Sequence, residues 1–208
     1  MWTHTKESQD KITPGMALEY LKEGNERFVQ NLRLHRDYLQ QVNSTSEGQF
    51  PFATILSCID SRTSAELIFD QGLGDIFSIR IAGNILNDDI LGSMEYACNI
   101  VKTKIIVVLG HTNCGAIISA CNKIEVGHLT TLLDKIKPAI KDETSVTDCR
   151  NGANMAFVEK VSIRNVHRTL GQVREKSSIL RLLERNGDII ITGAMYNVET
   201  GKVVFFEE

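Results

Sequence analysis

The chain has 208 residues, of which 42% are hydrophobic and 24% charged, and this composition suits one sizeable folded domain. A formal net charge of −3 gives no sign of a nucleic acid or an anionic membrane surface as partner. The first residues lack the apolar stretch of a secretory signal, and the longest apolar runs are far too short to span a bilayer. Five cysteines, an odd number, fit a disulfide framework poorly, so we expect a reducing, cytoplasmic location.

The N-terminal half of the sequence alternates between helix-like and strand-like patterns. Thr13 precedes Pro14 as an N-cap precedes a first helical residue, and the apolar spacing that follows predicts an amphipathic helix over 14–33. This helix belongs to an expected N-terminal helical arm, 1–35. The polar residues after it indicate a loop over 36–50. The next expected elements are a strand over 53–58, a short helix over 65–70 capped by Ser64, a strand over 76–81 and a helix over 87–102.

The C-terminal half contains the most apolar strand of the chain. The run KIIVVLGH, 104–111, is continuous and rich in β-branched residues, as expected for a central parallel strand covered on both faces. The remaining expected elements are a helix over 114–123, helical segments over 128–140 and 151–185, and strands over 188–192 and 202–206 joined by a turn at Thr200-Gly201. Together they predict an α/β fold with a mainly parallel central β-sheet flanked by helices, in a single domain over residues 1–208.

Two polar clusters follow apolar strands, where parallel sheets bind their ligands. The first is CIDSR, 58–62, and the second is GHTNCG, 110–115. Cys58, His111 and Cys114 are good ligands for zinc, and three protein ligands with an open fourth position describe a catalytic zinc site. Asp60 either fills the fourth position or orients the group that fills it. A reactive Cys114 thiolate or plain core cysteines are the alternatives, and the thiolate alternative leaves the rest of the first cluster unexplained.

With this ligand set, we expect neighbouring groups to assist the zinc-bound water. Two thiolates and a neutral imidazole nearly cancel the charge of Zn²⁺, so bound water should be less acidic than in a site made of imidazoles alone. A carboxylate that accepts a hydrogen bond from the hydroxide would fix its orientation, and Asp60 is suited to this role. Arg62, two residues later on an extended chain, can pair with that carboxylate and lower its pKa.

The sequence of these two clusters resembles the β-class carbonic anhydrases, whose signatures are Cys-x-Asp-Ser-Arg and His-x-x-Cys. The resemblance continues through GNERFV (24–29), IRIAGNI (79–85), SMEYA (93–97) and GAMYNVETGKV (193–203). It implies that Cys58, His111 and Cys114 ligate one zinc ion per chain and that Asp60 and Arg62 form the dyad of the family. The implied reaction is the reversible hydration of carbon dioxide to bicarbonate and a proton by zinc-bound hydroxide.

The same resemblance implies a substrate pocket of the plant-like type, made of Gln49, Phe77, Ala82, Tyr96 and Gly115. Gln49 stands nine positions before the first zinc cysteine, where that type has a donor to the substrate oxygen. Ile55 replaces the tryptophan of the bicarbonate-inhibited type, so we expect an open site with water on zinc near neutral pH. On general grounds, Gln49 in a polar loop faces solvent, and Gly115 either offers its N–H or only permits a tight helix start.

In this family the pocket lies at a dimer interface, which implies a homodimer or a higher even homo-oligomer, with the 14–33 helix over the partner. Cys98 and Cys121 are expected in the core and Cys149 on the surface. The alternatives in function are hydrolysis of carbonyl sulfide or carbon disulfide on the same zinc site, and a non-catalytic zinc or bicarbonate-binding module. We also expect a basic-side pH optimum, because the zinc water is weakly acidic and protonation of Asp60 would disturb the dyad.

Overall fold

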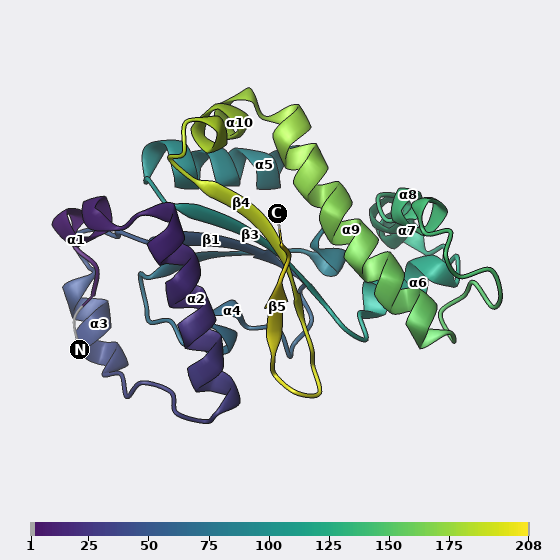
Figure 1. Cartoon of the computed structure of the whole chain (residues 1–208), viewed down its shortest axis with the longest axis horizontal. Coiled ribbons are helices and arrows are strands. Elements are labelled where there is room, and N and C mark those ends of the chain that lie inside the picture. The colour runs from purple at the N-terminus through teal and green to yellow at the C-terminus, as the bar shows by residue number, and fades with distance from the viewer. Residues whose placement is uncertain (1–2, 208) are drawn as a thin grey trace.

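A five-stranded sheet crosses the computed structural model, which describes residues 3–207 (Figure 1). The strand order is β2-β1-β3-β4-β5, and every neighbouring pair is parallel except β4 and β5. The strands are β1 (Ala53–Ser57), β2 (Ile76–Arg80), β3 (Ile105–His111), β4 (Ile190–Tyr196) and β5 (Val203–Phe205). The predicted α/β class and the mainly parallel sheet are confirmed. Residues 1, 2 and 208, at the ends of the expected domain and arm, lie outside the described part.

Helices cover both faces of the sheet (Figure 1). The helices and helical turns are α1 (Lys6–Lys11), α2 (Pro14–Val29), α3 (Tyr38–Ser44), α4 (Ala65–Ile68), η1 (Ala82–Asn84), α5 (Asp88–Glu95), η2 (Tyr96–Ile100), α6 (Gly115–Cys121), α7 (Gly127–Asp134), α8 (Lys137–Asp142), α9 (Met155–Lys176) and α10 (Ser178–Arg185). One core cluster joins α2 and α4 to the sheet, and a second joins α5, α9 and α10 to its other face. No helix within residues 3–207 has the length and apolar character that a membrane crossing requires.

The central strand β3 behaves as its sequence predicts, since all seven of its residues are buried. Its register pairs Leu109 with Ser57 of β1, and Ser57 is also paired with Arg80 of β2. The carboxyl ends of these three strands therefore lie side by side. A third core cluster, made with α6, α8 and α9, packs over this end and includes Cys58 and Cys114.

The region before β1 differs from its prediction in three places. The helix expected over 14–33 ends at Val29, and Asn31 has a positive φ of 57°. Helix α1 was not expected, although Thr5 and Ser8 form a capping box at its start. The expected 36–50 loop contains α3, which starts at the N-cap Asp37. Both missed helices are short and depend on polar caps, so they lack the apolar period that reveals longer helices.

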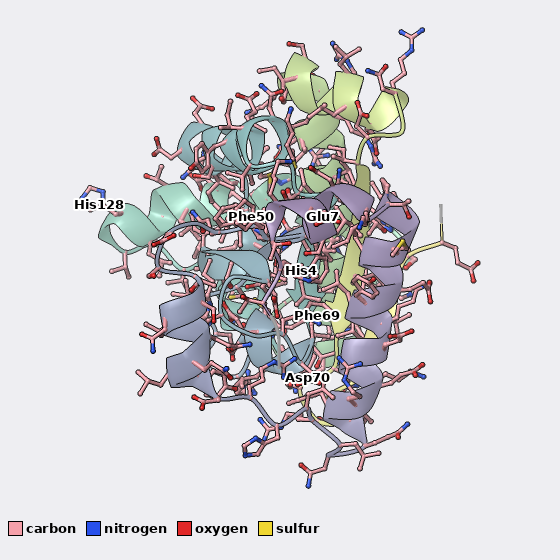
Figure 2. All side chains as sticks on the ribbon, turned by 90° about the vertical axis from the view of Figure 1, so that its left-hand side faces the viewer. His4, Glu7, Phe50, Phe69, Asp70 and His128 are labelled. Carbon is pink, nitrogen blue, oxygen red and sulfur yellow. The ribbon has the colours of Figure 1, made fainter. Side chains whose placement is uncertain are left out.

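A buried ion pair fixes the segment between α2 and α3. Asp70, which is 2% exposed, accepts hydrogen bonds from Arg27 at 2.6 Å, from Arg36 at 2.5 Å and from the Leu34 amide at 3.2 Å. Phe69 and Asp70 lie beside α2 in the side view of Figure 2. Helix α2 also packs its inner face against this chain's own sheet, where Ala17 and Leu21 are fully buried.

The C-terminal half departs from prediction at element boundaries. The helix expected over 87–102 changes into a π-helical turn at Tyr96, and the segment 151–185 divides at Ser177 into α9 and α10. Strand β4 continues to Tyr196 instead of ending at 192, because it pairs with the full length of β3 up to His111. Pairing along the sheet outweighs the low strand propensity of Gly193. The antiparallel pairing of β4 with β5 confirms the predicted hairpin.

Candidate metal centre

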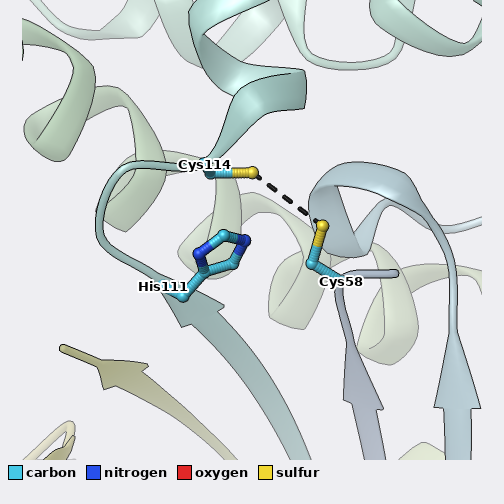
Figure 3. Close-up of side chains that lie close together, drawn as sticks. All are labelled: Cys58, His111 and Cys114. Carbon is cyan, nitrogen blue, oxygen red and sulfur yellow. Dashed lines mark hydrogen bonds between the residues drawn. The ribbon is translucent and has the colours of Figure 1, made fainter. Parts of the chain in front are cut away.

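Three buried side chains meet where β1 and β3 end. Cys58 follows β1, His111 is the last residue of β3, and Cys114 is the N-cap of α6. One ligand atom from each lies within 4.8 Å of the others (Figure 3). The predicted ligand set is thus assembled from two neighbouring parallel strands and the turn after the second.

The geometry of this cluster fits a zinc ion. The two sulfur atoms are 4.0 Å apart, and two thiolates on a tetrahedral zinc ion lie roughly 3.8 Å apart, given Zn–S bonds of about 2.3 Å. His111 Nδ1 is 2.8 Å from the Thr112 carbonyl oxygen, which only accepts, so Nδ1 carries the proton. The lone pair is then on Nε2, which is buried without a hydrogen-bond partner. A buried orphan acceptor beside two sulfurs is the arrangement that a metal ion completes.

The contact between the two sulfur atoms shifts the pKa values of the two thiols in opposite directions. The hydrogen bond from the Cys114 thiol lowers the pKa of Cys58 to about 4; burial opposes this shift, and the Gly83 and Asp60 amides add to it. The pKa of Cys114 is raised, because its proton is held by the Cys58 thiolate and because it is buried. A divalent cation would displace that proton and take both thiolates.

The turn η1 contacts the cluster from behind. The Gly83 amide donates to Cys58 Sγ at 3.3 Å, and the Gly83 carbonyl accepts a hydrogen bond of 2.8 Å from the buried Asn165 of α9. Gly83 has a φ of 69°, and a Cβ there would lie 2.9 Å from Ile136 Cδ1. Glycine is therefore required for the amide to reach the sulfur. Neither Gly83 nor Asn165 was expected at the site: the pairing of β2 with β1 brings Gly83 to it, and the packing of α9 brings Asn165.

Asp60 and Arg62 form the predicted pair. Arg62 Nε and Nη2 donate to the two carboxylate oxygens at 2.9 and 2.8 Å, and the Arg62 amide donates to the first at 3.0 Å. The hydrogen bonds from Arg62 lower the pKa of Asp60 to about 2. The chain here forms a turn and is not extended, contrary to the reasoning from sequence, because the carboxylate also binds the amide two residues later. Arg62 Nη2 reaches the Asn113 carbonyl at 3.4 Å and so spans the two strand ends.

The predicted substrate residues are divided between two regions of the surface. Phe77 and Tyr96 lie together, with ring centroids 6.4 Å apart, and line a cavity of about 560 Å³. Phe77 is paired with Thr54, four residues before Cys58, which places it roughly 13 Å along the strand from the metal ligands. Within one chain, these two rings therefore do not form a wall of the metal site.

The other three predicted residues have different surroundings. Ala82 begins η1 and is half-buried, while Gln49 is exposed in the segment between α3 and β1. Gly115, the first residue of α6, is exposed, and an added Cβ would meet nothing within 4 Å. Steric crowding is thus no reason for glycine at position 115. Cys98 and Cys121 are buried and Cys149 is exposed, as expected.

Comparison with known proteins gives one consistent answer. A family model described as "Carbonic anhydrase" matches residues 53–203. Carbonic anhydrase 2 of Mycobacterium tuberculosis is 36% identical over 199 residues, covering 92% of each chain. A carbonic anhydrase of Mycolicibacterium smegmatis is 34% identical over 196 residues, covering 91% of this chain and 92% of the relative.

Solved structures show the same likeness. The β-carbonic anhydrase CcaA superimposes with a TM-score of 0.71 at 25% identity, over 91% of this chain and 95% of that chain. A tetrameric β-carbonic anhydrase from Sordaria macrospora has a TM-score of 0.73 at 21% identity, over 92% and 97% of the two chains. At that identity the second comparison supports the fold alone.

Proposed function

Because the chain belongs to the β-class carbonic anhydrase family, we propose that it catalyses the reversible hydration of carbon dioxide to bicarbonate and a proton, with one zinc ion per chain. The observation that carries the proposal is the buried cluster of Cys58, His111 and Cys114 beside the Asp60–Arg62 pair. A closed structural site would need a fourth ligand, and within residues 3–207, which the structure describes, this cluster has three.

Zinc bound by these ligands would lower the pKa of a water molecule and so supply a hydroxide nucleophile on the basic side of neutral pH, because two thiolates leave the ion little net charge. The protein's own contribution is orientation. With a pKa of about 2, Asp60 is ionised and can only accept hydrogen bonds. A hydroxide that donates its hydrogen bond to this carboxylate is therefore held in one orientation. Arg62 binds both carboxylate oxygens and holds the plane of the carboxylate.

Carbon dioxide has no net charge and needs mainly apolar walls. We propose that the plant-like pocket is completed by a second copy of the chain, whose Phe77 and Tyr96 face the metal site of the first. Ala82 of the first chain adjoins Gly83 at its own site, and Gln49 and the Gly115 amide serve as polar donors. The 13 Å separation within one chain and the exposure of Tyr96, 52%, support this arrangement. We place the enzyme in the cytoplasm, in keeping with five free thiols.

The main test is a stopped-flow assay of carbon dioxide hydration on protein of measured zinc content. We expect wild type to bind one zinc ion per chain and to be active at and above about pH 8, where bound water is ionised. Cys58→Ser should lose zinc, whereas Cys149→Ser, at an exposed cysteine, should keep both zinc and activity. Asp60→Asn should keep zinc but lose activity by roughly a hundredfold. Zinc-loaded wild type without hydration activity would overturn the proposal, and carbonyl sulfide tested in parallel decides substrate preference.

Shared pockets can be tested with hybrid oligomers. Asp60→Asn and Phe77→Ala chains are each expected to be weakly active alone. If Phe77 serves the partner's zinc site, a hybrid of the two contains one fully native pocket, and activity should rise well above the mean of the two parents. Activity equal to that mean would show that each chain carries a complete site, and the proposed pocket would be wrong.

A further inference from the structure

Arg80 contacts the loop that carries Cys58 and Asp60. It is the last residue of β2, and its side chain is exposed. Its Nε donates to the Cys58 carbonyl at 3.1 Å, and its Nη2 donates to the Asp60 carbonyl at 2.7 Å. The sheet's own hydrogen bonding ends just before, where the Ile81 amide donates to Ser57 at 3.0 Å. Beyond the last backbone hydrogen bond between β2 and β1, the Arg80 guanidinium therefore holds residues 58–60 to the end of β2.

The two arginines near Asp60 bind different groups of it. Arg62 binds the carboxylate, and Arg80 binds the carbonyl. Thr63 supports the same carbonyl through its amide at 3.0 Å and its hydroxyl at 2.9 Å. Residue 60 is therefore fixed at its main chain and at its side chain, by groups from two separate segments.

A planar guanidinium suits this task because two of its N–H groups point in fixed, nearly parallel directions. The carbonyls of Cys58 and Asp60 must then stay side by side. A lysine ammonium is a single point charge and cannot impose that spacing. Cys58 is a predicted metal ligand and Asp60 the predicted orienting carboxylate. The Thr63 hydroxyl also contacts both carbonyls, at 3.0 and 2.9 Å, so Arg80 is the contact from β2 that joins this local one in setting the position of Asp60 relative to Cys58.

We propose that Arg80 is a positioning residue of the active site, which keeps the Asp60 carboxylate in place relative to the Cys58 ligand. This inference rests on the proposed hydration reaction. Arg80 is exposed, so its two carbonyl partners would gain water when it is removed, and the fold should persist. The loop would instead become looser, and a misplacement of about 1 Å at a reacting centre costs on the order of a hundredfold in rate.

Arg150 offers a matched control. It is also exposed and also binds two carbonyls, each at 2.7 Å, of Ile140 in α8 and of Val146 in the loop after it. Its guanidinium also lies over the Phe157 ring, and none of these groups belongs to the loop that carries Cys58 and Asp60. We therefore compare Arg80→Gln, Arg80→Lys and Arg150→Gln with wild type. The readouts are zinc per chain, kcat and KM for carbon dioxide, and amide hydrogen exchange. The amides of Arg62 and Thr63 report directly, because both donate to Asp60.

For Arg80→Gln we expect one zinc per chain, a kcat lowered roughly ten- to a hundredfold with KM little changed, and faster exchange at residues 62 and 63. Arg80→Lys should fall between this variant and wild type, and Arg150→Gln should change neither kcat nor that exchange. In an Asp60→Asn background, Arg80→Gln should cost little more, because both act through the same carboxylate.

The positioning role of Arg80 would be overturned if Arg80→Gln left amide exchange at residues 62 and 63 unchanged, or if it left kcat unchanged while wild type is active. Fully additive losses with Asp60→Asn would overturn it too. An inactive wild type would instead refute the hydration reaction, and the exchange data would still decide whether Arg80 holds Asp60.

Discussion

Replacing Gly83 with alanine tests how the metal centre is supported from η1. The added methyl group would lie 2.9 Å from Ile136 Cδ1 and 3.3 Å from Ala116 Cβ, on a residue whose φ is 69°. The left-handed alanine is strained and crowds two side chains, so we expect the turn to relax and the 3.3 Å hydrogen bond from its amide to Cys58 Sγ to lengthen or break. The variant therefore weakens the hydrogen bond to the Cys58 sulfur, a proposed zinc ligand, while all three ligand residues stay unchanged.

The size of the effect follows from the groups involved. A hydrogen bond to a charged group contributes about 1.5–3 kcal/mol, and each 1.4 kcal/mol is about a tenfold change in affinity. Zinc affinity should therefore fall roughly ten- to a hundredfold, as is usual when a group supporting a metal ligand is lost. Folding stability should fall by about 1–2 kcal/mol for the left-handed alanine and by a further 1–3 kcal/mol for the crowding.

Gly187→Ala separates these contributions. Gly187 has a similar φ of 77°, but an added Cβ would meet nothing within 4 Å, and the residue lies beyond α10. It should show the left-handed cost alone and wild-type zinc affinity. Zinc affinity is measured by competition with a chelator and stability by urea unfolding of the zinc-free proteins. If Gly83→Ala binds zinc as tightly as Gly187→Ala, the amide does not support the thiolate and the reasoning fails.

Three further predictions concern charge. Asp70→Asn should cost about 3–5 kcal/mol in urea unfolding, because Arg36 would stay buried without its partner; an effect below 1 kcal/mol would contradict the structural role of the pair. Burial raises the pKa of Asp70, but hydrogen bonds from Arg27 and Arg36 outweigh burial, so the pKa is lowered from its ordinary value of 3.8. The charged carboxylate therefore stabilises the fold fully above pH 3.8, and this stabilisation is lost as the pH falls below that value. Wild type should therefore lose more stability than Asp70→Asn when acidified through that range. Asp60, with a pKa of about 2, stays ionised at pH 5–8, so Asp60→Asn should lower the hydration rate but keep an acid limb in its pH profile, and loss of that limb would assign it to Asp60.

The low pKa of Asp60 revises one reason for the basic-side pH optimum that we expected from the sequence. Protonation of Asp60 was one of two reasons to expect a basic-side optimum. Three hydrogen bonds from Arg62 keep this carboxylate charged far below neutral pH. Any such optimum must then come from the metal-bound water, the first of the two reasons. The sequence placed Arg62 beside Asp60 but could not show that a turn would add the amide as a third donor.

Sequence patterns were sufficient where the signal is local. The continuous apolar run of β3 and the polar residues after it located His111 and Cys114 at a strand end, and the parallel topology then required Cys58 to be near. The supporting contacts have no such signal. Asn165 reaches Gly83 across 82 positions of sequence, and Arg80 reaches Asp60 across 20, so their roles appear only when α9 and β2 have packed.

The short polar helices show the same limit from another side. Helix α3 buries Gln41, at 2% exposure, and leaves Leu39 71% exposed, the reverse of the usual pattern. Gln41 accepts a hydrogen bond of 3.2 Å from the Leu73 amide, so a polar contact holds this helix in place. A method that reads apolar periodicity assigns such a segment to a loop.

The adjacency of β1 and β3 also has a consequence for how the chain folds. Cys58 and Cys114 are 56 positions apart in sequence and meet only after these two parallel strands have paired. Long-range parallel pairing is a slow step in folding, because a long loop must close before any contact compensates for its lost entropy. Zinc captured early by His111 and Cys114, three positions apart, would lack its third protein ligand until β1 pairs with β3. A tight, correctly coordinated zinc ion should therefore mark a chain whose central sheet is complete.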